Sequence, residues 1–213
     1  MAVYDLEEQE QIAEIKAWWA RYGNLVMTLL LALALGFAGW QMWNRYRGSG
    51  AAEASALYSE LQQAVSADNA EQTRELAGKL ISGHGNTVQA QLGALLSAGM
   101  QFKKNDLDNA TPQLEWAADK GKDAALRDLA RLRLAAVLMQ KGDLDAALAR
   151  LQPVPEGALR ARFEDLRGDI LASQGKYAEA RTAWQAGIGI LSNAGNEAAL
   201  RDIIRVKLES LEG

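Results

Sequence analysis

The sequence predicts an all-α protein in which one N-terminal transmembrane helix is followed by a solenoid of paired helices. Three observations predict this class: a long uncharged apolar run near the N-terminus, the lack of alternating β-branched runs after it, and an internal repeat. Only 3 of the 213 residues are proline, the residue least compatible with a helix interior. We therefore expect helix over most of the chain.

The composition excludes several classes of site. The chain has no cysteine, which excludes disulfides, thiolate metal sites and cysteine nucleophiles. Its single histidine, His84, excludes multi-histidine metal sites, and the glycine-rich stretch around it predicts an exposed turn residue. The net charge of −4 offers no excess of positive charge for phosphates, so nucleic acid is not an expected partner.

Motifs that carry chemistry are also missing from the sequence. No phosphate-binding loop, nucleophile elbow, zinc-binding helix or calcium-binding loop occurs. We therefore expect a non-enzyme with no catalytic residue, no cofactor and no metal.

Residues 23–44 are predicted to form the transmembrane helix. The run carries no charge and, at about 1.5 Å per helical residue, spans a hydrocarbon core of about 30 Å. Aromatic side chains expected at the two membrane interfaces flank it: Trp18, Trp19, Tyr22, Trp40, Trp43 and Tyr46. A buried core helix and a cleaved signal peptide are the alternatives. The long acidic leader and the length of the apolar run argue against the signal peptide.

Residues 1–22 form a leader whose apolar side chains recur at helical spacing, which predicts an amphipathic helix at the membrane interface. Positive charges nearly balance across the span, with Lys16 and Arg21 before it and Arg45 and Arg47 after it. The positive-inside rule therefore favours a cytoplasmic N-terminus but does not decide the orientation. Inside the span, the small residues Ala32, Gly36 and Gly39 predict a seam where another helix packs closely.

After a linker over residues 45–55, residues 56–213 contain three similar segments, at 105–114, 142–151 and 175–184. They resemble the tetratricopeptide (TPR) repeat, a pair of helices that stacks on its neighbours. The corresponding signature residues are Ala110, Leu114, Ala135, Gly142, Ala147, Leu151, Gly168, Gly175, Ala180 and Trp184.

Each signature position has an expected structural role. Ala135 and Gly168 are small where the two helices of a pair cross, and Gly142 and Gly175 end the first helix in a turn. Leu151 and Trp184 are expected to fill the gap to the next unit. A degenerate helical pair precedes these units, and a C-terminal apolar stripe predicts a capping helix.

A TPR stack usually binds its partner on the surface lined by the first helix of each pair. By register, the groove candidates are Phe102, Leu132, Met139, Asp165 and Asp169. The two aspartates argue against an acidic C-terminal peptide as the ligand.

The order of segments resembles the YfgM family, an ancillary subunit of the bacterial SecYEG translocon. The resemblance rests on the acidic leader, Gly39-Trp40-x-x-Trp43 at the end of the apolar run, the small residues of 51–58, and Gly175 to Trp184. It implies an inner-membrane protein with a cytoplasmic N-terminus and a periplasmic TPR domain. It also implies SecYEG, the membrane-anchored periplasmic chaperone PpiD and exported client proteins as partners.

Two other functions remain open from the residues alone. The chain is alternatively a TPR adaptor of another cell-envelope complex, or a membrane-anchored regulator whose TPR domain lies in the cytoplasm. The near balance of flanking charges keeps the second alternative open.

Overall fold

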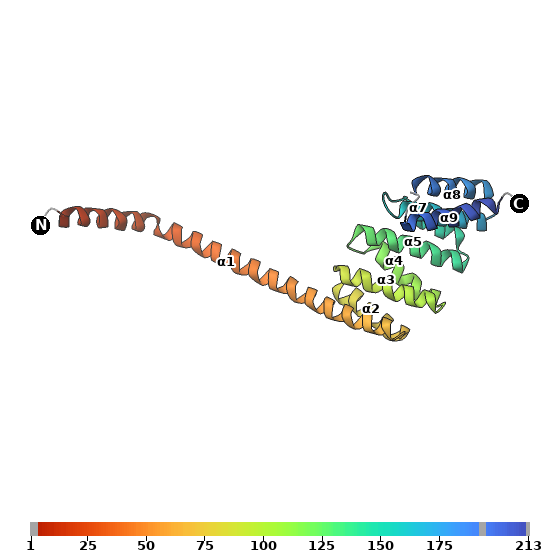
Figure 1. Ribbon diagram of the computed structural model, residues 1–213. Coiled ribbons are helices and arrows are strands. Elements are labelled where there is room, and N and C mark those ends of the chain that lie inside the picture. The colour runs from red at the N-terminus through yellow and green to blue at the C-terminus, as the bar shows by residue number, and fades with distance from the viewer. Residues whose placement is uncertain (1–3, 192–194, 212–213) are drawn as a thin grey trace. The chain divides into compact units, whose positions relative to one another are not determined.

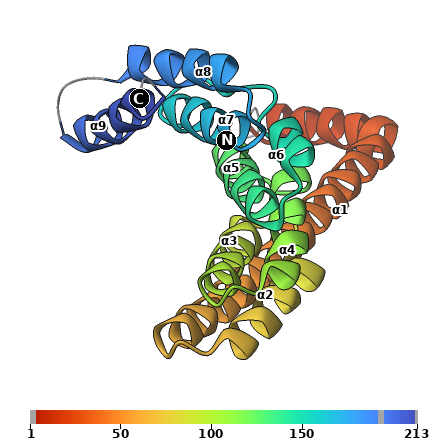
Figure 2. The same ribbon diagram turned by 90° about the vertical axis from the view of Figure 1, so that its right-hand side faces the viewer.

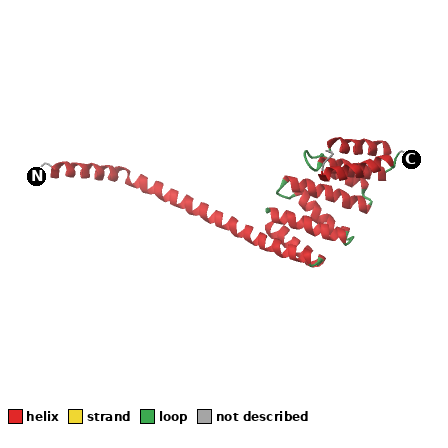
Figure 3. Cartoon of the chain, in the orientation of Figure 1, coloured by secondary structure: helices red, strands yellow, loops and turns green. Residues whose placement is uncertain are grey.

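The computed structural model describes residues 4–191 and 195–211, and this part of the chain is helical with short connecting turns (Figures 1 and 3). Side chains are described for residues 11–42, 50–191 and 197–211. The predicted all-α class is confirmed. The helices are α1 (Tyr4–Ser66), α2 (Ala70–His84), α3 (Val88–Lys103), α4 (Leu107–Asp119), α5 (Ala124–Lys141), α6 (Leu144–Arg150), α7 (Arg160–Ser173), α8 (Tyr177–Ile190) and α9 (Gly195–Glu209).

The chain divides into two compact units, residues 1–50 and residues 51–213. The described part of the first unit, residues 4–50, is a single helical segment, the N-terminal part of α1. Its stretch Gln11–Met42 is long and apolar enough to cross a membrane, and none of its most apolar window is buried within the protein. Large apolar side chains therefore face outward along it, as lipid contact requires.

Helix α1 continues through residues 45–55, which the sequence predicts as a linker. The second unit accordingly begins at Ala51, earlier than the expected residue 56. Ala54 is fully buried, in one apolar cluster with Leu61 of α1 and Leu80 of α2. Packing of these residues holds the end of α1 in the helical domain.

The second unit is a stack of helical pairs. Residues 51–66 pair with α2, and α3 with α4, α5 with α6 and α7 with α8 follow in order, before α9 ends the chain (Figure 2). Contacts also join the first helices of neighbouring pairs, α3 with α5 and α5 with α7. The largest core cluster runs through α3, α4, α5 and α6 to Phe163 and Ile170 of α7. This continuous core is what stacking repeats need for stability.

Local sequence sets where the helices begin and end. Asn69, Thr87, Asp106 and Asp123 each accept a backbone N–H bond at a helix start. Gly142 after α5 and Gly175 after α7 have positive φ values of 87° and 76°, which glycine adopts without strain. Asn105 takes the same role after α3 with a φ of 60°.

His84 differs from its expected exposure. It is the last residue of α2, and its side chain is only 15% exposed, with Nε2 3.9 Å from Glu53 Oε2. The neighbouring end of α1 covers it, a contact between segments 31 residues apart that the local glycine pattern does not reveal.

Candidate functional site

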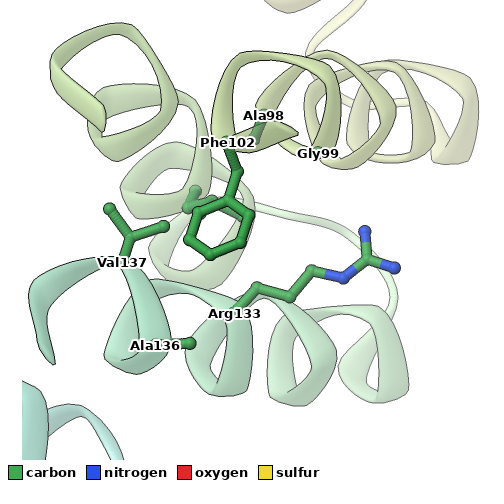
Figure 4. A pocket seen from close by; sticks show the side chains of 7 residues that line it. Ala98, Gly99, Phe102, Arg133, Ala136 and Val137 are labelled. Carbon is green, nitrogen blue, oxygen red and sulfur yellow. The ribbon is translucent and has the colours of Figure 1, made fainter. Parts of the chain in front are cut away.

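An apolar hollow lies between α3 and α5, the first helices of two neighbouring pairs. It has a volume of about 230 Å³ (Figure 4). We call it the α3–α5 groove, and define it by Ala98, Gly99, Phe102, Leu114, Arg133, Ala136 and Val137. The groove therefore contains the first of the predicted groove residues, Phe102.

Phe102 stays exposed although it lies against the domain core. Its side chain is 41% exposed, and Figure 4 shows the ring between α3 and α5, beside Val137 and over the aliphatic part of Arg133. An exposed aromatic ring in a hollow is a suitable contact for an apolar side chain of a partner.

Leu132 and Met139, also predicted for the groove, are half-buried and pack against the main core cluster. Their principal contacts hold α5 against its neighbours. The structure does not bring them into the hollow that Phe102 lines.

Asp165 and Asp169 are not free to line a groove, because α9 covers them. Lys207 Nζ of α9 lies 2.6 Å from Asp165 Oδ1 and 2.8 Å from Asp169 Oδ2. Burial raises the pKa of the Asp165 carboxyl, while the hydrogen bond and charge of Lys207 lower it. The two aspartates therefore form an internal ion-pair cluster that attaches the capping helix, and they no longer argue against an acidic ligand elsewhere.

Trp184 packs within its own pair. Its ring lies against Gly168 of α7, and its Nε1–H donates to the Asp165 carbonyl at 3.1 Å. The same side chain also belongs to a buried apolar cluster with Ile204 of α9, the helix that follows the pair. A wide aromatic ring in α8 fits against α7 because position 168 has no side chain. The two signature residues are thus complementary within one repeat.

Apart from the turn glycines Gly142 and Gly175, the other repeat-signature residues lie in the interior of the stack. Those that are almost fully inaccessible to solvent are Ala110, Leu114, Ala135, Ala147, Leu151 and Ala180. Their small size or apolar character is used to bring helices together. They are structural positions, and of these six only Leu114 also lines the α3–α5 groove.

The membrane segment contains the second set of candidate residues. Trp18, Trp19, Tyr22 and Trp40 have exposed side chains. The side chains of Trp43 and Tyr46 are outside the part of the chain whose side chains the structure describes. At Gly36 and Gly39, no atom of the described chain lies within 4 Å of the position that a Cβ atom would occupy. A second helix therefore has room to approach the backbone at these two glycines.

Sequence reasoning missed Gly99 and Arg133, which both line the groove. The repeat spacing contains a signal for Arg133, because that position corresponds to Leu96 in the preceding pair and Leu166 in the following one. A cation where neighbouring repeats carry leucine is unusual for packing. Comparing repeat positions by charge, instead of by the signature alone, would have identified it.

Comparisons with known proteins agree with the fold and with the segment order. A family model described as a tetratricopeptide repeat-like domain matches residues 16–213. The chain is 30% identical over 210 residues to the ancillary SecYEG translocon subunit of Neisseria gonorrhoeae, covering 97% of this chain and 98% of that protein. The chain belongs to the family of ancillary SecYEG translocon subunits. The predicted family resemblance is thereby confirmed.

Two further members show how much of the chain this family shares. The ancillary SecYEG translocon subunit of Escherichia coli is 30% identical over 211 residues, with 99% of both chains covered. The ancillary SecYEG translocon subunit of Haemophilus influenzae is 29% identical over 182 residues, which cover 85% of this chain and 89% of the relative. The family match thus includes the N-terminal apolar helix as well as the helical repeats.

Proposed function

We propose that this chain is a non-enzymatic, single-pass scaffold of the bacterial inner membrane that associates with the SecYEG translocon. Its TPR domain cooperates there with a membrane-anchored periplasmic chaperone of the PpiD type and with newly exported proteins. The observation that carries the proposal is the near full-length match to ancillary SecYEG translocon subunits, anchor and repeats together.

The two units have complementary roles in this proposal. The apolar helix confines the TPR domain to the membrane surface, which raises its effective concentration at the translocon exit. Weak contacts between a TPR surface and its partner are then sufficient. A soluble domain of the same affinity would be diluted away from the site.

We assign the translocon contact to the small-residue seam of the membrane helix, Ala32, Gly36 and Gly39. Co-purification of SecYEG from membranes in mild detergent tests this assignment. Gly36→Leu should weaken the association because its side chain fills the space at the seam. Ala34→Leu, on another face of the same helix, is the matched control and should behave as wild type.

The topology is tested with single cysteines, because the chain has none of its own. Ser59→Cys, on an exposed part of the TPR domain, should react with a membrane-impermeant maleimide after permeabilisation of the outer membrane alone. Gln11→Cys in the leader should react only after lysis. The opposite pattern would contradict the periplasmic domain and favour the cytoplasmic regulator instead.

Wild-type protein that co-purifies with envelope proteins but without SecYEG would contradict the translocon role. That result would favour the adaptor of another envelope complex. Wild-type protein that co-purifies with SecYEG but without the PpiD-type chaperone would support the association with the translocon and contradict the cooperation with the chaperone.

A further inference from the structure

The α3–α5 groove adjoins a second hollow, and the two share Gly99 and Arg133. The second hollow, of about 310 Å³, extends toward the end of α1 and is lined partly by Val65, Leu95, Leu96 and Met100. Together the two hollows form one largely apolar depression that crosses α3. A depression of this extent has room for several consecutive side chains of a peptide.

Gly99 keeps the middle of this depression open. It lies on the exposed face of α3, and no atom lies within 4 Å of where its side chain would begin. Glycine inside a helix lowers helix stability relative to alanine, and packing within this protein does not require it here. Its effect is to let another backbone approach α3 closely.

Arg133 is a cation without an acidic partner at the same place. One guanidinium N–H donates to the Leu95 carbonyl at 3.2 Å, and within the described part of the chain no carboxylate forms an ion pair with it. By contrast, Lys104 is paired with Asp68 and Lys141 with Asp108. The residue is exposed overall, and burial of part of its side chain lowers the pKa of Arg133.

The charges around the depression are predominantly positive. Lys103 lines the second hollow beside Arg133, and Asp68, the only carboxylate among the described residues that line it, is already paired with Lys104. An unpaired guanidinium beside apolar surface has free donors suited to a carboxylate, which it binds with two parallel hydrogen bonds. The surface is therefore complementary to an apolar segment that carries one acidic side chain.

We infer that the depression over Gly99 binds a short apolar peptide segment of a partner protein, with a carboxylate of that segment on Arg133. An adjacent apolar side chain of the segment packs against Phe102, whose ring is 41% exposed. The inference rests on the proposed scaffold function, since it states what chemistry the scaffold recognises. It assigns the recognition to the surface over α3 and α5, away from the ion-pair cluster of Asp165, Asp169 and Lys207.

Fluorescence anisotropy on the full chain in lipid nanodiscs tests the inference, with empty nanodiscs as the baseline. The probe is a fluorescein-labelled dodecapeptide with blocked ends, in which leucines and serines surround one central glutamate. A second probe has glutamine in place of the glutamate. Wild type should bind the glutamate probe about tenfold more tightly, the ratio expected for one charge-assisted hydrogen-bonded contact.

Three variants separate the groove from the rest of the protein. Gly99→Leu should abolish binding of the glutamate probe without loss of helicity, because the space it fills is empty. Gly78→Leu, at an exposed and equally open position of α2, should bind as wild type does. Arg133→Gln should bind the two probes equally.

Several outcomes would overturn the inference. They are equal binding of both probes by wild type, unchanged binding by folded Gly99→Leu, and no binding of either probe. Concentration-dependent dimerisation that Gly99→Leu abolishes would assign the depression to a second copy of the chain instead. Retention of SecYEG by wild type in any of these cases would leave the proposed function standing, because that association is assigned to the membrane helix.

Discussion

The indole ring of Trp184 lies so close to the backbone of Gly168 that a Cβ atom at position 168 would be 2.4 Å from ring atoms Cδ1 and Nε1. The ring is 4% exposed, and its Nε1 also lies 3.2 Å from Asp169 Oδ1. One contact between two signature residues thus sets the spacing of α7 and α8. It also directs the indole N–H toward the carboxylates that bind Lys207 of α9.

Gly168→Ala should destabilise the helical domain by about 1–3 kcal/mol, because the new methyl group overlaps the Trp184 ring and the rigid indole has no room to withdraw. Urea denaturation followed by circular dichroism measures the change. Gly189→Ala in α8, where the space is open, is the control and should be neutral or stabilising. Equal effects at both positions would contradict the tight contact.

Lys207→Met should loosen α9, because it leaves the Asp165 and Asp169 side chains, only 16% and 27% exposed, without their cation. We expect a loss of about 1–2 kcal/mol, between the values for exposed and fully buried ion pairs. Amide hydrogen exchange should rise in α9 first. The double variant Lys207→Met, Asp165→Asn should regain part of the lost free energy of unfolding, because one uncompensated carboxylate is removed. If the double variant is no more stable than Lys207→Met, the unpaired carboxylates are not the cause of the loss.

Asp165 should give the domain an unusual pH dependence. Burial raises its pKa in the folded state, so the folded protein binds this proton more tightly than the unfolded chain does. Its contribution to stability is therefore largest below the ordinary pKa of an aspartate and is lost as the pH rises through the raised folded value. The carboxylates of Asp68 and Asp108, whose pKa values are lowered by lysines, contribute in the opposite direction.

Comparison of wild type with Asp165→Asn isolates this effect, because all other titrating groups are shared. As the pH is lowered from 7 through the acidic range, wild type should gain unfolding free energy relative to the variant. Urea titrations at several pH values measure the difference. A difference that falls with decreasing pH would mean that Lys207 outweighs burial at this site.

Gln91→Leu should destabilise the domain by about 2–4 kcal/mol. The side chain of Gln91 is fully buried, and its amide donates to the Ala117 and Asp123 carbonyls and accepts from the Asp123 N–H at 2.9 Å. Leucine would leave these backbone groups without partners in the turn between α4 and α5. Thermal denaturation of the full chain in mild detergent measures the loss.

The matched control for that variant is Gln89→Leu, because the hydrogen bond that the structure gives the Gln89 amide is donated to the exposed Ser55 hydroxyl. Its effect should stay within about 0.5 kcal/mol. A comparable loss at the two positions would show that leucine in α3 is harmful in general. The loss would then say nothing specific about the buried turn.

Much of this protein follows from its sequence alone. The apolar span, the repeat units and the glycine turns at Gly142 and Gly175 are encoded by short-range patterns, because hydrophobic periodicity and backbone preference act over a few residues. Order and spacing of those patterns were also enough to indicate the family. Repeat register also named Phe102 as a groove candidate, and the structure places it at the edge of a hollow.

Only the tertiary structure decided how distant side chains combine. Asp165 and Asp169 look like groove residues in sequence, yet Lys207, about 40 positions later, neutralises them. Arg133 looks like an ordinary surface cation, yet no carboxylate in the described chain reaches it and Gly99 leaves the space beside it open. The reason is physical: whether a charge is paired and whether a surface is covered depend on contacts between helices, and these form only when the pairs stack.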